Sequence, residues 1–365
     1  MSNFLTVQDI ARQGLLRLRN NLVTASLVYK DHSNDFAQKG DTISVKVPNT
    51  FVAQEFSGMT SPQGITEDKV LVSLDKIATV DVEVSAKEMT LNINDFGQQI
   101  LNPAMEALAQ KIDSDLLGLY VDIPYFSGIA GTTPSALSDF ANAAKVLNTN
   151  KAPMSMRSTI FDPNATAKFQ VLDALVGLDK SGSTDALRNG SIGRVLGLDN
   201  YMDQNVKSHV KGTVTAGNAT GTAGVKTISL AAVAPSGGTL KKGDLFTIAG
   251  DSTQYVVTAD VTASTTTVAS LAIYPALAVT AAGAAITVVA NHAANLAFHK
   301  NAFSLVSRPL ALPTGGANGY VSNFEGLSIR VTQGYSMSKK INELSFDILY
   351  GVKTLQPELA VRVLG

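Results

Sequence analysis

The sequence predicts an α+β protein in which strands from both ends of the chain share a sheet and a separate all-β module is inserted between them. Alternating apolar and polar residues mark strand regions early in the chain, at Thr42–Val47 and Val70–Val84, and late, at Leu327–Val331 and Leu344–Val352. Between them, Thr213–Asn291 changes abruptly in composition. At roughly 100 to 200 residues per domain, the 365 residues should form two or three domains.

An amphipathic helix is predicted for residues 4 to 29, where apolar side chains such as Leu15 and Leu18 lie between Arg12 and Arg19. The first 30 residues hold 4 Lys or Arg and 1 Asp. This mildly basic segment could contact phosphates or an acidic partner. A solvated helix face is the better interpretation of such a weak excess of charge.

A long loop, Asn49–Lys69, separates the first two strand regions. Long loops within compact domains are uncommon and are usually functional. This one carries three large apolar side chains, Phe51, Phe56 and Met59. Because such side chains need a surface that covers them, we identify them as candidate contacts with a neighbouring subunit.

Three later segments have the pattern of a helix that begins at a capping residue followed by proline. Asn102-Pro103 predicts a long helix that ends near Val121, with apolar residues every three or four positions. Thr133-Pro134 and Asp162-Pro163 have the same pattern of a capping residue followed by proline, and they predict two further helices of about 14 residues each.

The segment Thr213–Asn291 is rich in Thr, Val, Ala and Gly and contains no Arg or Glu. Short β-branched runs are separated there by Gly, Ser, Pro and Asp, which predicts a small all-β barrel or sandwich. Its charged residues are Lys226, Lys241, Lys242, Asp244, Asp251 and Asp260.

The composition excludes several functional classes. The net charge is -1 and 16% of residues are charged, so no partner is implied by charge alone. The absence of Cys excludes disulfides and thiolate sites, and the absence of Trp and of a basic stripe argues against specific nucleic-acid readout. Asp9 and Arg12 interrupt any secretory signal, and no apolar run is long enough for membrane insertion.

Signatures of enzymes are missing. Gly238 and Gly243 have the spacing of a phosphate loop, but Asp244 stands where the Lys should be, so a turn is predicted. Gly190–Gly193 lacks the spacing of a nucleophile elbow and is interpreted as a loop between helices. Asp81 and Glu83 point to one face of a strand, which fits a solvated face better than an acid-base pair.

The histidines do not form a metal site in the sequence, because none lies three or four residues from another. Two of them, seven residues apart, could share a helix face, but no nearby carboxylate completes a ligand set. Structural or surface roles are therefore favoured, and we expect no metal, no cofactor and no catalytic residue. The four histidines are His32, His209, His292 and His299.

The order of these features resembles the major capsid proteins of tailed bacteriophages, specifically the coat proteins of short-tailed phages that carry an insertion domain. The local matches are KGDTISVKVP before the loop, KKGDLFTIAG within the module, LAFHKNAFSLVSRPL after it and YGVKTLQPELAV near the end. The likeness extends over nearly the whole chain. Each motif alone is weak, and their order and spacing carry the resemblance.

The resemblance implies the phage capsid fold, with an N-terminal arm, an extended loop, a peripheral domain, an axial domain and an inserted small all-β barrel. On this mapping the arm is 1–40, the extended loop with its strands 41–86, the peripheral domain with its spine helix 87–152, the axial domain 153–211 and 292–330, the inserted β domain 212–291, and the strands that return to the peripheral sheet 331–365.

The function that the resemblance implies is self-assembly into the icosahedral shell of a virion, built from pentamers and hexamers in the host cytoplasm. A separate scaffolding protein, a portal protein and packaged double-stranded DNA, bound without sequence specificity, are the implied partners. Gly40, Gly58 and Gly64 are candidate hinge or tip positions, because one sequence must adopt several nearly equivalent environments.

One segment departs from the family pattern. Where members can carry a long, charged hairpin that bridges capsomers, this chain has the short, uncharged VTAGNATGTAGV. Stabilisation by salt bridges at that place is therefore in doubt. The alternative function is a surface or tail-associated adhesin whose Thr-rich module binds a receptor or glycan, although the missing export signal and the lack of Trp argue against it.

Overall fold

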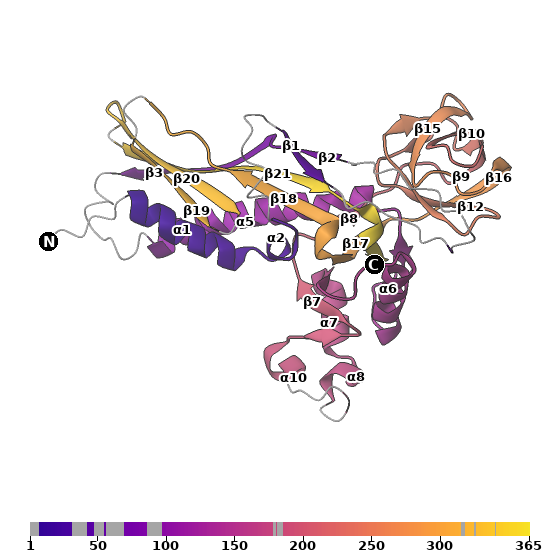
Figure 1. The fold of residues 1–365 in the computed structure, drawn as a ribbon, viewed down its shortest axis with the longest axis horizontal. Helices are drawn as coiled ribbons and strands as arrows, with labels where there is room; N and C mark the ends of the chain where they lie inside the picture. The colour runs from indigo at the N-terminus through magenta and orange to yellow at the C-terminus, as the bar shows by residue number, and fades with distance from the viewer. Residues whose placement is uncertain are drawn as a thin grey trace. The chain divides into compact units, whose positions relative to one another are not determined.

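The structure is a computed structural model. It describes residues 7–30, 42–46, 55, 69–85, 97–177, 180, 185–314, 318–324, 326–339 and 341–365. The chain forms two compact units and passes between them several times (Figure 1). Unit 1 comprises 1–21, 29–111 and 304–355, and unit 2 comprises 22–28, 112–303 and 356–365.

Unit 1 is built on a 5-stranded sheet whose printed strand pairs are antiparallel. Its strands are β18 (Phe303–Arg308), β21 (Ile341–Thr354), β20 (Leu327–Ser336), β19 (Asn318–Phe324) and β3 (Lys76–Ser85). The early strand β3 pairs along β21, from Ile341 opposite Ser85 to Tyr350 opposite Lys76. The purple and yellow strands lie side by side in Figure 1. The prediction that distant strands share a sheet is confirmed.

Two further predicted elements of unit 1 are present. The alternation of Val70–Val84 resolves into β2 (Lys69–Ser73) and β3, and β2 pairs with β1 (Thr42–Lys46) as an antiparallel ribbon. The N-terminal helix α1 (Val7–Asn21) buries its apolar stripe, as the amphipathic pattern predicts.

The long helix α5 (Asn102–Leu117) is also present, and a 3-10 turn (Gly118–Asp122) continues it to the predicted end. Its start differs from the prediction. A π-helical turn, Gly97–Leu101, precedes Asn102 directly, so Asn102 lies inside the helical run and is not its N-cap. The proline at position 103 is tolerated because its missing N–H falls where the π turn gives way to the α-helix.

Unit 2 contains a 7-stranded mixed sheet. Its strands are β4 (Phe126–Ser127), β22 (Ala360–Leu364), β17 (His292–His299), β5 (Arg157–Phe161), β7 (Leu198–Met202) and β6 (Arg194–Val195), with β8 (Ser208–His209) paired to β17. The sequence did not predict β5, β17 or β22. These strands are buried almost throughout, so they lack the alternation that marks a half-exposed strand.

Of the two helices predicted at about 14 residues each, the first has nearly that length and the second is shorter. α6 (Leu137–Thr149) begins after the predicted Thr133-Pro134 start, where the Asp139 carboxylate accepts from the backbone N–H of Ser135 and of Ala136. α7 (Pro163–Gln170) has the predicted cap, because Asp162 accepts from Ala165 N at 3.3 Å. It ends after 8 residues, and α8 (Asp173–Val176) and α10 (Asp185–Asn189) follow.

The inserted module is a closed barrel, so the predicted all-β module is confirmed (orange in Figure 1). Its strands in barrel order are β10 (Thr227–Ala234), β15 (Val268–Tyr274), β13 (Gln254–Val257), β12 (Leu245–Ile248), β16 (Ala281–Val288) and β9 (Ala216–Gly221). A separate pair, β11 (Thr239–Leu240) and β14 (Val261–Thr262), lies off this ring. Closure leaves no strand edge exposed within the ring.

Candidate functional site: a buried polar network at the base of the barrel

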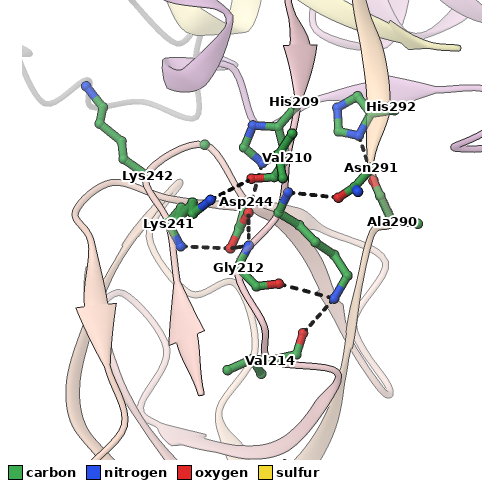
Figure 2. A network of polar contacts seen from close by, with 12 residues as sticks. His209, Val210, Gly212, Val214, Lys241, Lys242, Asp244, Ala290, Asn291 and His292 are labelled. Atoms are coloured by element: carbon green, nitrogen blue, oxygen red, sulfur yellow. Dashed lines mark hydrogen bonds and ion pairs between the residues drawn. The ribbon is translucent and has the colours of Figure 1, made fainter. Parts of the chain in front are cut away.

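A buried carboxylate ties the strand that leads into the barrel to a turn of the barrel itself. Asp244, in the turn between β11 and β12, has no solvent-exposed surface. Its carboxylate accepts hydrogen bonds from the backbone N–H of Lys241 at 2.8 Å and of Gly212 at 3.1 Å (Figure 2). His209, on β8, contributes its Nε2 at 2.8 Å. Asp244 therefore holds together two segments that are more than 30 positions apart in the chain.

His209 lies between Asp244 and Tyr120 and contacts both through its ring nitrogens. Its Nε2–H donates to Asp244, and its Nδ1 lies 3.0 Å from the Tyr120 hydroxyl. If the ring is neutral and carries its proton on Nε2, then Nδ1 is an acceptor, and the Tyr120 O–H donates to it. Burial raises the pKa of Tyr120, which keeps that proton on the phenol. Tyr120, His209 and Asp244 thus form one continuous chain of hydrogen bonds inside unit 2.

A fully buried arginine from the last strand joins the same network. Arg362 on β22 donates from Nη1 to the carbonyl oxygen of Gly243 at 2.8 Å, and its Cζ lies 5.1 Å from the centre of the Tyr120 ring. Burial lowers the pKa of Arg362 to about 9, so the guanidinium stays charged at neutral pH. Its Nε and Nη2 find no hydrogen-bond partner among the described residues.

The outgoing strand completes the cluster. His292 on β17 donates from Nδ1 to the Ala290 carbonyl at 2.8 Å, and its ring centre lies 5.3 Å from that of His209. Burial, more than the neighbouring Arg362, lowers the pKa of His292 to about 4, so this ring is neutral at pH 7. The Asn291 side chain accepts from the backbone N–H of Lys211 at 3.0 Å (Figure 2).

Two glycines permit this close packing. A Cβ at position 212 would lie 2.0 Å from the Thr239 carbonyl oxygen, which no real side chain tolerates. At position 243 the backbone has φ +95°, and a Cβ would lie 2.9 Å from Val121 Cγ1. Only glycine meets both conditions without strain.

The network is suited to structure rather than to reaction chemistry. Asp244, His209, His292 and Arg362 are each at most 4% exposed, so no substrate reaches them in this conformation. Within the described part of the chain, no three His, Cys, Asp or Glu side chains are placed to hold a metal ion. The arrangement fixes where the barrel is attached within unit 2.

The structure also settles several predicted motifs. Gly238 and Gly243–Asp244 lie in turns, as predicted. Gly190–Gly193 connects α10 to the strand β6, so the prediction that it links two helices is wrong. Asp81 and Glu83 lie exposed on β3, as predicted.

His292 and His299 share a strand rather than the helix face that their spacing allowed, because both belong to β17. Both are buried, as is His209, which fits the structural roles that the sequence favours. His32 lies outside the described residues.

The candidate contact and hinge positions lie elsewhere. Phe51, Phe56 and Met59, together with Gly40, Gly58 and Gly64, all fall outside the described residues. They remain predictions. Sequence reasoning missed the buried network, since Asp244 was interpreted as a turn residue alone. The signal available was a carboxylate in a module with few charges, because a charge kept in such surroundings is often paired and buried.

Comparison with known proteins shows which folds this architecture is similar to. Residues 255–365 match the family described as "P22 coat protein - gene protein 5". The matched segment begins on β13 of the barrel and runs through both sheets to the C-terminus. A solved structure described as Mycobacterium phage Che8 has a TM-score of 0.52 at 15% identity, over 94% of this chain and 90% of that one. The chain has the fold of tailed-phage major capsid proteins.

Two further capsid structures are similar at lower scores. The capsid of cyanophage P-SCSP1u gives a TM-score of 0.48 at 12% identity, over 89% of this chain and 83% of that one. The capsid of Ralstonia phage GP4 gives 0.46 at 9% identity, over 92% and 86%. No curated protein matches significantly.

The predicted fold class is confirmed, including a barrel inserted into the capsid fold. In the described residues, no helix combines the length and apolar character needed to cross a membrane.

Proposed function

We propose that this chain is the major capsid protein of a tailed bacteriophage and that it self-assembles into the icosahedral shell enclosing the genome. The observation that carries the proposal is the capsid fold with a closed barrel inserted in it, combined with the coat-protein match of residues 255–365. That match spans the return from the barrel into the sheets, so it covers the junction that distinguishes this architecture. The comparisons give no support to the adhesin alternative.

Finer features extend the proposal. The division into arm (1–40), extended loop (41–86), peripheral domain (87–152), axial domain (153–211 and 292–330), inserted domain (212–291) and returning strands (331–365) follows the resemblance. Pentamers and hexamers of the chain would form the shell in the host cytoplasm. A scaffolding protein, a portal protein and double-stranded DNA on the inner face would be its partners. Many weak, repeated contacts suffice for such a shell, because assembly is multivalent.

Electron microscopy of purified protein tests the shell directly. Expressed with a scaffolding protein from the same phage, the chain should yield closed particles tens of nanometres across. Small, uniform oligomers that persist both with and without the scaffolding protein would contradict the proposal.

Substitutions in the loop test the proposed subunit contacts. Replacing Phe51, Phe56 and Met59 by Asp should abolish particle formation, because a carboxylate cannot be buried unpaired between subunits. The hydrogen-exchange pattern of the barrel should match that of the wild type, which would show that the subunit is folded. An unchanged particle yield would refute the assignment of these three residues. Replacing Gly58 or Gly64 by Val should reduce the particle yield less than these Asp substitutions do, because a hinge glycine supplies backbone freedom and not a contact surface.

A further inference from the structure

A short segment near the N-terminus is held in unit 2 by carboxylates from far along the chain. Residues Leu22–Val28 belong to unit 2, whereas α1 before them and the chain from Tyr29 belong to unit 1. The segment contains one helical turn, α2 (Thr24–Leu27). A single turn is unstable by itself, because helix nucleation is unfavourable. Something else must stabilise it.

The stabilising group is Asp113 on α5. The N-cap residue of α2, Val23, provides no side-chain cap. Instead, the backbone N–H of Val23 donates to Asp113 Oδ2 at 2.9 Å, and that of Ala25 donates to Asp113 Oδ1 at 2.9 Å. These are N-terminal N–H groups that lack a partner within the helix. Asp113 therefore caps α2 from 88 to 90 positions away.

A second carboxylate binds the same turn. Asp203 accepts from the Thr24 hydroxyl at 3.0 Å, and its other oxygen accepts from Asn205 N at 2.8 Å and Asn205 Nδ2 at 2.9 Å. Thr24, Asp113 and Asp203 are 2%, 2% and 5% exposed. Since the carboxylate oxygens already accept hydrogen bonds from protein donors, the pair is not arranged as a cation site.

Among the described residues, no cation pairs with the two buried carboxylates. The charged group that acts on Asp113 is Asp203, and no Lys or Arg of the described chain is among the groups that shift it. Lys207 lies close, but its Nζ binds the hydroxyl of Ser114 at 2.6 Å. Burial, followed by the charge of Asp203, raises the pKa of Asp113 to about 6, against the opposing effect of the backbone N–H groups.

We propose that Asp113, beside Asp203, makes residues 22–28 a proton-sensitive anchor, which is held tightly when Asp113 carries a proton and is loosened when Asp113 loses it. The proposal does not depend on shell assembly. It rests on three observations: a helix cap supplied by a distant residue of the same chain, two buried carboxylates that bind one helical turn, and a segment that connects two stretches of unit 1.

The direction follows from linkage. Release of the segment would expose Asp113 to water and return its pKa toward the ordinary value of 3.8. The pKa is higher in the anchored state, so a proton favours anchoring. The contribution is complete below about pH 4 and is lost as pH rises through about 6. Between pH 5 and pH 7 the equilibrium for release should shift on the order of tenfold toward the released form.

Hydrogen exchange of the full chain tests the anchor. Protection of the amides of residues 22–28, corrected for intrinsic exchange rates, should fall on the order of tenfold from pH 5 to pH 7. In Asp113→Asn the side chain cannot ionise, so the pH dependence should disappear even if protection changes overall. Asp203→Asn removes the like charge, so the loss of protection should move to lower pH.

The control is Asp162→Asn, which alters a helix cap of the same unit on α7 and should leave the pH profile of residues 22–28 unchanged. Flat protection in the wild type between pH 5 and pH 7 would overturn the proposal. So would an Asp113→Asn profile that keeps the wild-type slope. An Asp203→Asn profile identical to the wild type would exclude Asp203 from the anchor.

Discussion

Substitution of Asp244 by Ala should loosen the attachment of the barrel more than any exposed change nearby. The carboxylate accepts from three donors, His209 Nε2, Gly212 N and Lys241 N. Lys241 is exposed, so water can replace that bond, whereas His209 and Gly212 are buried. A buried donor left without a partner costs about 1–3 kcal/mol. The expected loss is therefore about 2–6 kcal/mol of stability for the barrel and its junction.

The matched control is Asp260→Ala. Asp260 accepts from the backbone N–H of Lys242 at 2.6 Å in the same region of the barrel, but it is exposed. Its loss should cost less than about 1 kcal/mol, as is usual for surface positions.

Hydrogen exchange of the barrel amides measures both variants, because it reports the free energy of opening region by region without assuming that the whole chain unfolds in one step. If Asp244→Ala lowers the protection of β12 and of Gly212 no more than Asp260→Ala does, the buried network does not hold the barrel in place. A large loss in Asp244→Ala alone would support the reasoning.

Three other substitutions have defined outcomes. Tyr255→Phe leaves Ala278 N–H without the hydroxyl it binds at 2.9 Å and removes a bond to Asp251, so thermal unfolding should show a loss of about 1–3 kcal/mol. His292 has its pKa lowered to about 4, so its contribution is present above pH 6.5 and is lost as pH falls toward 4. In the wild type the free energy of unfolding should fall by up to about 3 kcal/mol over that pH window because of His292. His292→Gln should remove this part of the fall, as measured by urea titration at each pH. Gly212→Ala should prevent soluble expression, whereas Gly334→Ala, with nothing within 4 Å of its Cβ, should express normally.

Half-exposed elements were predictable because one face meets water. The strands β3 and β21 alternate along most of their paired length, and the amphipathic α1 repeats its apolar residues at helical spacing. The barrel was predictable from composition, since its β-branched runs are separated by turn residues. In each case the local sequence carries the contrast between inside and outside.

Fully buried elements were not predictable in this way. In β17 and β22 nearly every residue is buried, so neither strand alternates. Arginine usually lies on the surface of proteins, but Arg362 on β22 is fully buried. Its partners, Tyr120 and Gly243, lie more than 100 positions earlier. A contact of that range leaves no local pattern, and the same is true of the Asp113 cap on α2.

The position of the insertion explains why a polar network lies at its base. The chain enters the barrel after Lys211 and leaves it at Asn291, and these two residues are joined by a hydrogen bond of 3.0 Å. Adjacent ends allow a module to be inserted without disturbing its host sheet. A connection made of two neighbouring strands is, however, easily rotated. The contacts of Asp244 with His209 and of Arg362 with Gly243 cross this connection. Because rotation would separate buried hydrogen-bonding groups from their partners, the attachment has a preferred geometry.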